Sequence, residues 1–218
     1  MKNKFFLILF LVLFLTSFSN INSDLKININ VNDDYTFLKE EIFTFSSISL
    51  GTFIFDESIR NFNESINIKF PSIESITDEK VLLGGNSTIF FYSIFSKDKK
   101  LQRVSLESFQ KAFFAGSIAY ASKIFFGRAR PYLELGHNNF DFFNFNYNFH
   151  SFPSGHSTVS WALLTPYAEN YNKAFYIIPA FISISRIIED KHWTSDVIIG
   201  SALGFFIGKY LPYFEFSF

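Results

Sequence analysis

Five runs without a charged residue dominate the chain from residue 81 onward, and they limit its fold more than any other feature. They are Val81–Ser96, Ala112–Ser122, Ser157–Ala168, Ala174–Ser185 and Val197–Gly208. Each is shorter than the roughly 20 apolar residues that a membrane span needs. We therefore expect an all-α, single-domain helical bundle that is exported and rests at most against a membrane. A polytopic membrane protein remains the alternative, because Lys123 and Arg186 would face a site and need not interrupt a span.

Composition excludes several classes of protein. The chain has 218 residues, a formal net charge of −1 and no cysteine. That length suits one domain with a real core. The charge balance provides no basic surface for nucleic acid, and disulfides are excluded. The sequence leaves the oligomeric state open.

The N-terminus resembles a secretory signal. Lys2 and Lys4 precede an apolar run from Phe5 to Leu15, and small residues follow up to Ser19. That run is short for a span and typical of a signal peptide. We expect residues 1–19 to be the signal, 20–77 a lead-in with helices, and 78–218 the core. The protein would then act in a periplasm or at the outer face of an inner membrane, and an uncleaved anchor is the alternative.

Local signals place the helices. Residues 25–31 alternate like a strand but lack a visible partner, so we expect an extended lead-in. We expect helices over 35–55, 56–62, 81–95, 105–126, 153–168, 174–188 and 194–211, with caps at Asp56 and Ser105. Asn61 to Thr77 reads as a loop. Gly200, Gly204 and Gly208 form a smooth stripe that predicts close helix packing.

The stretch Phe152-Pro153-Ser154-Gly155-His156 carries the strongest chemical signal. Proline suits a helix start, and glycine allows a ligand to approach the backbone. Free N–H groups at a helix start attract anions such as phosphate. His156 adds an imidazole that titrates near neutral pH.

Two further segments fit the same chemistry. Lys123 and Arg130 are seven residues apart, which would put both cations on one helix face before Pro131 ends the helix. Two cations in an apolar segment call for an anion. Downstream, His192 and Asp196 are four apart, so the carboxylate could fix the imidazole tautomer and leave the other nitrogen free to attack.

Together, the segments 123–131, 153–156 and 185–196 resemble the three motifs of the type 2 phosphatidic acid phosphatase superfamily. That superfamily also contains class A acid phosphatases and vanadium haloperoxidases. Its patterns are Lys, six residues, Arg-Pro; Pro-Ser-Gly-His; and Ser-Arg, five residues, His, three residues, Asp. Every specified position matches across about residues 105–211, including Ser185 and Arg186. The resemblance implies the helical bundle of that superfamily.

The resemblance also implies roles for residues. His192 would be the nucleophile, Asp196 its orienting partner, and His156 the general acid and then base. Phosphate would be bound by Lys123, Arg130, Ser154, Gly155 and Arg186, without a metal or other cofactor. The implied function is a metal-independent phosphatase of the cell envelope, acting on a phosphomonoester or diphosphate, with a lipid phosphate favoured. Alternatives are a broad-specificity soluble acid phosphatase, a vanadium haloperoxidase or a non-catalytic member.

Several neighbouring residues lie outside the motifs. Arg128 is expected to have a surface or supporting role, and His137 and His150 to be ordinary loop residues. Glu189 and Asp190 are expected to be solvated. The segment 138–152 is rich in phenylalanine and should lie at the mouth of the site. Its rings indicate either contact with a lipid or membrane, or packing and codon bias, and both readings stay open.

Overall fold

The computed structural model describes residues 25–28, 35–66 and 78–216. Two compact units are present, one formed by the chain ends and one by Val31–Leu211. The predicted signal segment and residues 67–77 lie outside the described residues.

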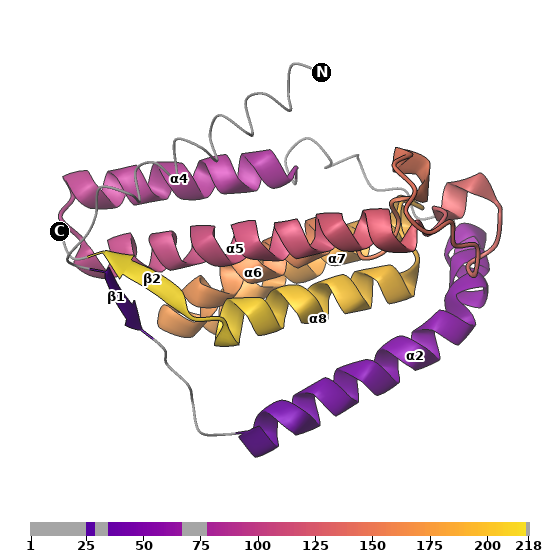
Figure 1. Cartoon of the computed structure of the whole chain (residues 1–218), viewed down its shortest axis with the longest axis horizontal. Coiled ribbons are helices and arrows are strands. Elements are labelled where there is room, and N and C mark those ends of the chain that lie inside the picture. Colours follow the sequence, from indigo (N-terminus) through magenta and orange to yellow (C-terminus); the bar gives the residue numbers. More distant parts are fainter. Residues whose placement is uncertain (1–24, 29–34, 67–77, 217–218) are drawn as a thin grey trace. The chain divides into compact units, whose positions relative to one another are not determined.

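The larger unit is helical (Figure 1). Its helices are α2 (Tyr35–Ile66), α4 (Glu79–Phe95), α5 (Lys99–Phe126), α6 (Gly155–Asn170), α7 (Ile177–Ile188) and α8 (Thr194–Tyr210). Short 3₁₀ turns occur at Pro131–Leu133, Tyr147–Phe149 and Lys173–Tyr176. The helix α6 lies at the centre, packed against α5, α7 and α8, while α4 packs on α5 and α2 runs along α8. The expected all-α bundle is confirmed.

The glycine stripe of α8 explains the close contact between α8 and α6. A Cβ at Gly200 would lie 2.7 Å from the Ser154 carbonyl oxygen, and one at Gly204 would lie 2.2 Å from that of Thr158. At Gly208 a Cβ would meet the Thr165 side chain at 2.6 Å. Only glycine leaves room for the α6 backbone, so the predicted packing role of the stripe is confirmed.

Two predicted helix starts are wrong. The helix α2 runs without a break through Asp56, which is 1% exposed and is not a cap. The helix α5 begins at Lys99, where the Asp98 side chain accepts from the Leu101 backbone N–H. Ser105 instead lies inside α5 and donates to the Leu101 carbonyl. Side-chain contacts across the fold outweigh the local capping signal at Asp56, and the earlier Asp98 supplies the cap of α5.

The smaller unit corrects another expectation. Strand β1 (Leu25–Asn28) pairs antiparallel with β2 (Tyr213–Phe216), with Leu25 opposite Phe216 and Asn28 opposite Tyr213. The alternating segment is therefore part of a two-stranded sheet rather than an unpaired lead-in. Its partner follows Pro212 at the far end of the chain, where aromatic residues favour a strand.

Candidate functional site

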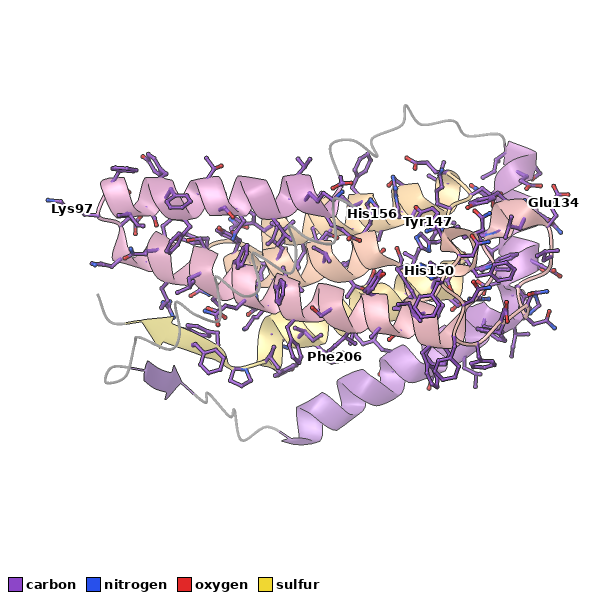
Figure 2. The ribbon with its side chains drawn as sticks, turned by 45° about the horizontal axis from the view of Figure 1, so that its top comes forward. Lys97, Glu134, Tyr147, His150, His156 and Phe206 are labelled. Carbon is purple, nitrogen blue, oxygen red and sulfur yellow. The ribbon has the colours of Figure 1, made fainter. Side chains whose placement is uncertain are left out.

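A polar pocket of about 270 Å³ opens at one end of the bundle. The start of α4, the end of α5, the loop 131–152, the start of α6 and the α7–α8 connection all contribute to its wall. Figure 2 shows Tyr147, His150 and His156 together at this end, far from Lys97. The pocket brings together these predicted site residues: Lys123, Arg130, Gly155, His156, Arg186 and His192.

Lys123 joins α5 to the start of α6. It lies in the last turn of α5, and its Nζ donates to the carbonyls of His150 at 2.9 Å and Pro153 at 2.6 Å. Burial, together with the nearby charge of Arg130, lowers the pKa of Lys123 to about 7. A bound anion would favour the charged form of this amine.

Arg130 reaches the pocket by a different route from the one predicted. The helix α5 ends at Phe126, because Gly127 adopts a left-handed conformation with φ of 53° and its N–H bonds to the Lys123 carbonyl. Arg130 is therefore in extended backbone, not on the same helix face as Lys123. Its Nη1 donates to the Lys191 carbonyl at 3.0 Å, and its guanidinium lies 4.3 Å from the Tyr147 ring centroid.

The start of α6 presents Gly155 and His156 to the pocket. The helix begins at Gly155, directly after the N-cap residue Ser154. The Ser154 hydroxyl is fully buried and accepts from the Ser157 hydroxyl at 3.1 Å. Ser154 is not part of the pocket wall. Direct contact between its hydroxyl and phosphate thus stays a prediction, whereas Gly155 places a helix start at the pocket.

His156 faces both the pocket and α4. Its Nε2 is buried without a hydrogen-bond partner, and its Nδ1 lies 3.9 Å from the Glu79 carboxylate. Burial and the charges of Arg186 and Lys123 lower the pKa of His156 to about 4. A free ring nitrogen in such a pocket can exchange a proton with a bound ligand.

Arg186 completes the set of cations. It is 1% exposed and lies in the last turn of α7, where Glu189 pairs with it at 2.7 Å. The Glu189 side chain is only 11% exposed, so the expectation that it is solvated is wrong. The Glu189 carboxylate is kept away from solvent because its negative charge offsets the buried Arg186 guanidinium. Asp190 instead binds Arg60 of α2 at 2.8 Å and 2.9 Å.

His192 is held by a backbone carbonyl. Its Nδ1 lies 2.7 Å from the Ser151 carbonyl oxygen, an acceptor that requires the proton on Nδ1. The lone pair is therefore on Nε2. Burial lowers the pKa of His192 to about 3, although Asp196 acts in the opposite direction. A neutral imidazole with a defined tautomer is the form that can act as a nucleophile.

Asp196 lies behind His192, and its closest contacts are with other groups. The carboxylate is 3.9 Å from His192 Nδ1, beyond hydrogen-bond distance. It accepts from Arg128 Nη1, from the Ser151 hydroxyl and from the Trp193 backbone N–H. Burial opposes ionisation, but Arg128 and the neighbouring donors outweigh it and lower the pKa of Asp196 to about 2.

Sequence reasoning missed three residues that shape this site. Asp56 binds both Arg128 and Ser195, Ser151 links Asp196 to His192, and Glu79 approaches His156. Arg128 is 0% exposed, so of its two expected roles only the supporting one fits the structure. Glu79 lies in the first turn of α4, directly after the capping residue Asp78. This acidic helix start was the sequence signal that could have identified Glu79.

The two loop histidines differ in position. The His150 side chain is buried, its Nε2 lies 2.9 Å from the Asn144 carbonyl oxygen, and the residue lines the pocket. His137 lies 3.7 Å from Glu57, and its carbonyl accepts from Arg128. His150 thus shares the pocket wall with His156 and His192, so the expectation of an ordinary loop residue does not describe its position, whereas His137 does not line the pocket.

Within residues 25–28, 35–66 and 78–216, no helix is long and apolar enough to cross a membrane. In that same part of the chain, no group of three or more histidine or acidic residues is arranged to hold a metal ion.

Comparison with known proteins shows the family. The model of the PAP2 superfamily matches residues 111–217. A lipid A 1-phosphatase of Porphyromonas gingivalis is 32% identical over 101 residues, covering 43% of this chain and 20% of that protein. A lipid A 1-phosphatase of Rhizobium etli is 36% identical over 101 residues, covering 44% of each. The chain thus matches less than half the length of these curated relatives.

A solved structure is also similar. It is the crystal structure of a transmembrane PAP2 type phosphatidylglycerolphosphate phosphatase from Bacillus subtilis, with a TM-score of 0.48 and 18% identity. The similarity covers 78% of this chain and 90% of that one. The family model and the lipid A 1-phosphatase relatives establish that the chain belongs to the PAP2 superfamily, through its residues 111–217.

Proposed function

We propose that the protein is a phosphatase that hydrolyses a phosphomonoester or diphosphate through a phosphohistidine intermediate. One observation carries the proposal above the others. His192, with Nδ1 bound to the Ser151 carbonyl, lines the same pocket as the cations Lys123, Arg130 and Arg186. A neutral nucleophile beside clustered positive charge suits attack on an anionic phosphoryl group.

The reaction follows from this arrangement. His192 Nε2 attacks phosphorus, a P–N bond forms, and the P–O bond to the leaving group breaks. Protonated His156 gives its proton to the departing alkoxide. Neutral His156 then takes a proton from water, the water oxygen attacks phosphorus, and the P–N bond breaks. Phosphate leaves, and His192 returns to its neutral form.

Protonation of His156 before the first step needs the substrate. In the free protein, burial and the neighbouring cations lower the pKa of His156 to about 4. A phosphate dianion brings negative charge beside the ring and favours its protonated form. Substrate binding therefore favours the protonated His156 that acts as the general acid, whereas the imidazole is neutral in the free protein.

In this proposal, side chains stabilise the negative charge of the phosphoryl oxygens during transfer. The guanidinium groups and the amine bind the non-bridging oxygens, whose charge changes during transfer. We accordingly propose a metal-independent reaction. Vanadate, which resembles the five-coordinate transition state, is expected to occupy the same pocket as a competitive inhibitor.

The favoured substrate is a lipid phosphate, and two observations support this choice. The curated relatives are named as lipid A 1-phosphatases. In addition, Phe142, Phe143 and Phe145 are 56%, 65% and 78% exposed, in the loop that also carries the pocket residue Tyr147. Exposed rings beside a polar pocket suit an amphiphilic ligand. Export to the periplasmic side of a membrane, the compartment expected from residues 1–19, is part of the same proposal.

A substrate panel tests the function. Purified protein is given lipid A, phosphatidic acid, a polyprenyl diphosphate and p-nitrophenyl phosphate, each with and without EDTA, and released phosphate is measured. We expect release from at least one lipid phosphate that EDTA does not suppress. Turnover of the soluble ester alone would favour a broad-specificity acid phosphatase. Peroxidase activity with vanadate and no phosphate release would overturn the proposal, as would the absence of any turnover.

A further inference from the structure

A buried polar network extends from α2 to the proposed nucleophile. The Arg128 guanidinium donates through Nη2 to Asp56 Oδ2 at 2.8 Å and through Nη1 to Asp196 Oδ1. Its Nη1 also donates to the Ser195 hydroxyl oxygen at 2.8 Å. Arg128 is 0% exposed, Asp196 0% and Asp56 1%, so the network is closed to water.

Asp56 also contacts Ser195, the residue directly before Asp196. Besides Arg128, it accepts from the Ser195 backbone N–H at 2.9 Å and from the Ser195 hydroxyl at 2.5 Å. Ser195 lies in the first turn of α8, directly before Asp196. Asp56 therefore holds the start of α8 through the backbone and holds the guanidinium that binds Asp196.

The network reaches His192 through Ser151. The Ser151 hydroxyl donates to Asp196 Oδ2, and the Ser151 carbonyl is the acceptor for His192 Nδ1. The Ser151 backbone N–H donates to the Arg128 carbonyl at 3.0 Å. One arginine thus binds Asp196 with its side chain and holds Ser151 with its backbone, so both neighbours of the imidazole depend on Arg128.

We propose that Asp56 and Arg128 are positioning residues that fix the orientation and tautomer of the His192 imidazole through Asp196 and Ser151. This makes α2 part of the catalytic apparatus, although Asp56 lies outside the region matched by the family model. The inference rests on the proposed role of His192 as nucleophile. Its structural half, the state of the imidazole, can be measured without any turnover.

The main competing explanation is that the site only requires α2 to stay packed against the rest of the bundle. The Arg60 side chain provides a control for this explanation. Arg60, one turn further along α2, binds Asp190 through two hydrogen bonds of 2.8 Å and 2.9 Å. The hydrogen bonds and ion pairs of the Arg60 guanidinium are with Asp190 and Glu64, not with Asp196 or Ser151. Arg60→Gln therefore weakens the attachment of α2 and leaves the network around Asp196 in place.

The test compares Asp56→Asn with Arg60→Gln. We expect Asp56→Asn to lower kcat by on the order of tenfold to a hundredfold with little change in KM, because a small misplacement of a reacting group has a large cost in rate. Arg60→Gln should retain kcat. Long-range ¹H–¹⁵N spectra of the four histidines, with His192→Gln for assignment, should show Nδ1–H in the wild type and its loss or exchange in Asp56→Asn.

A second variant separates positioning from folding if Asp56→Asn is poorly folded. Arg128→Lys keeps a buried cation beside Asp56 and Asp196, so no carboxylate is left without a positive charge, but an ammonium lacks the planar fork that donates to Asp56, Asp196 and Ser195 together. Its kcat should nevertheless be low. Wild-type kcat in Arg128→Lys, or an unchanged His192 tautomer in Asp56→Asn, would overturn the proposal. An inactive wild type with the expected tautomer change would reject the proposed function and keep the positioning role.

Discussion

Two hollows in the described part of the bundle have opposite character. The polar pocket has a volume of about 270 Å³ and is lined by cations and histidines. The other is an apolar hollow of about 600 Å³ between α2, α8 and the loop, and Phe53, Phe126, Phe140 and Phe206 are among its lining residues. The larger hollow has almost no reactive group, so its size does not mark it as the site.

Arg128 connects the apolar hollow to the residues behind the polar pocket. Its side chain lines the apolar hollow, and the Phe53 ring centroid lies 4.9 Å from its Cζ. Its guanidinium nevertheless binds Asp196, behind the polar pocket. The aromatic rings of the hollow exclude water from the ion pair, which strengthens its electrostatic interactions. The comparison teaches that one region performs the proposed chemistry and the other shields the groups that support it.

The largest expected effect comes from the proposed nucleophile. His192→Ala should abolish turnover and preserve the helical fold, because the imidazole forms the covalent intermediate. Acid-labile phosphate trapped on the wild type with labelled substrate should be missing from the variant. Turnover near the wild-type level would show that another group attacks phosphorus.

The cations of the polar pocket should have the next largest effect. Arg186→Gln is expected to lower kcat/KM by about 100-fold or more, the usual loss when one donor to transition-state charge is removed. Competitive inhibition by vanadate should weaken in parallel. Arg103, whose Nη2 binds the Asn170 side chain away from the pocket, provides a matched control, and Arg103→Gln should retain kcat/KM. Equal losses in both variants would indicate a general loss of folding.

Sequence reasoning identified more of the pocket lining than of the residues that support it. The motifs contain Lys123, Arg130, Gly155, His156, Arg186 and His192, which line the polar pocket, whereas Ser154 and Asp196 do not line it. The motifs did not identify Asp56, whose partners Arg128 and Ser195 are far away in the chain. An isolated aspartate in an apolar helix looks locally like a cap, and only the tertiary structure reveals its partners.

Two different causes explain the errors at a helix end and at a strand. Gly127 ends α5 before Arg130, a local event that the spacing of Lys123 and Arg130 does not reveal. The pairing of β1 with β2 joins segments from opposite ends of the chain. By contrast, the packing role of Gly200 and Gly204 was predictable, because a glycine every four residues is a regular pattern along one helix face.

Acid should destabilise the protein through the polar pocket. Burial and nearby cations lower the pKa values of His156 and His192 to about 4 and 3, from 6.5 in model compounds. Below pH 6.5 the unfolded state binds more protons than the folded state, so stability falls as the pH drops. The upper limit of this slope is about 1.4 kcal/mol per pH unit for each histidine.

Chemical denaturation at pH 7.0 and pH 5.0 measures this loss of unfolding free energy. His192→Gln should reduce the difference between the two pH values by up to half, because one of the two neutral histidines is gone. The lining of the apolar hollow contains no histidine or carboxylate within the described residues, so Phe206→Leu should leave the difference unchanged. An equal pH dependence in the wild type and His192→Gln would contradict a neutral, buried His192.

The smallest expected effect concerns the loop beside the polar pocket, and it depends on the substrate. Phe142, Phe143 and Phe145 expose large apolar areas, and the first two also pack against Phe125, with ring centroids 6.0 Å and 5.1 Å apart. Insertion of one such ring into a bilayer contributes roughly 1.5–3 kcal/mol, so a few rings hold a protein on a membrane transiently. Replacing all three with serine should reduce liposome binding and turnover of a lipid phosphate several-fold.

The same triple variant should retain turnover of p-nitrophenyl phosphate, which needs the polar pocket and no membrane. Its matched control replaces Phe91, Tyr92 and Phe95 with serine, since these α4 side chains are 59%, 64% and 83% exposed. Phe95 precedes Lys97, which Figure 2 places at the opposite end of the bundle from His156. If both triple variants lose lipid turnover equally, the exposed rings act as a general apolar surface. Equal loss on the lipid and the soluble ester in the loop variant would instead show that its rings hold the pocket in shape, because packing affects every substrate alike.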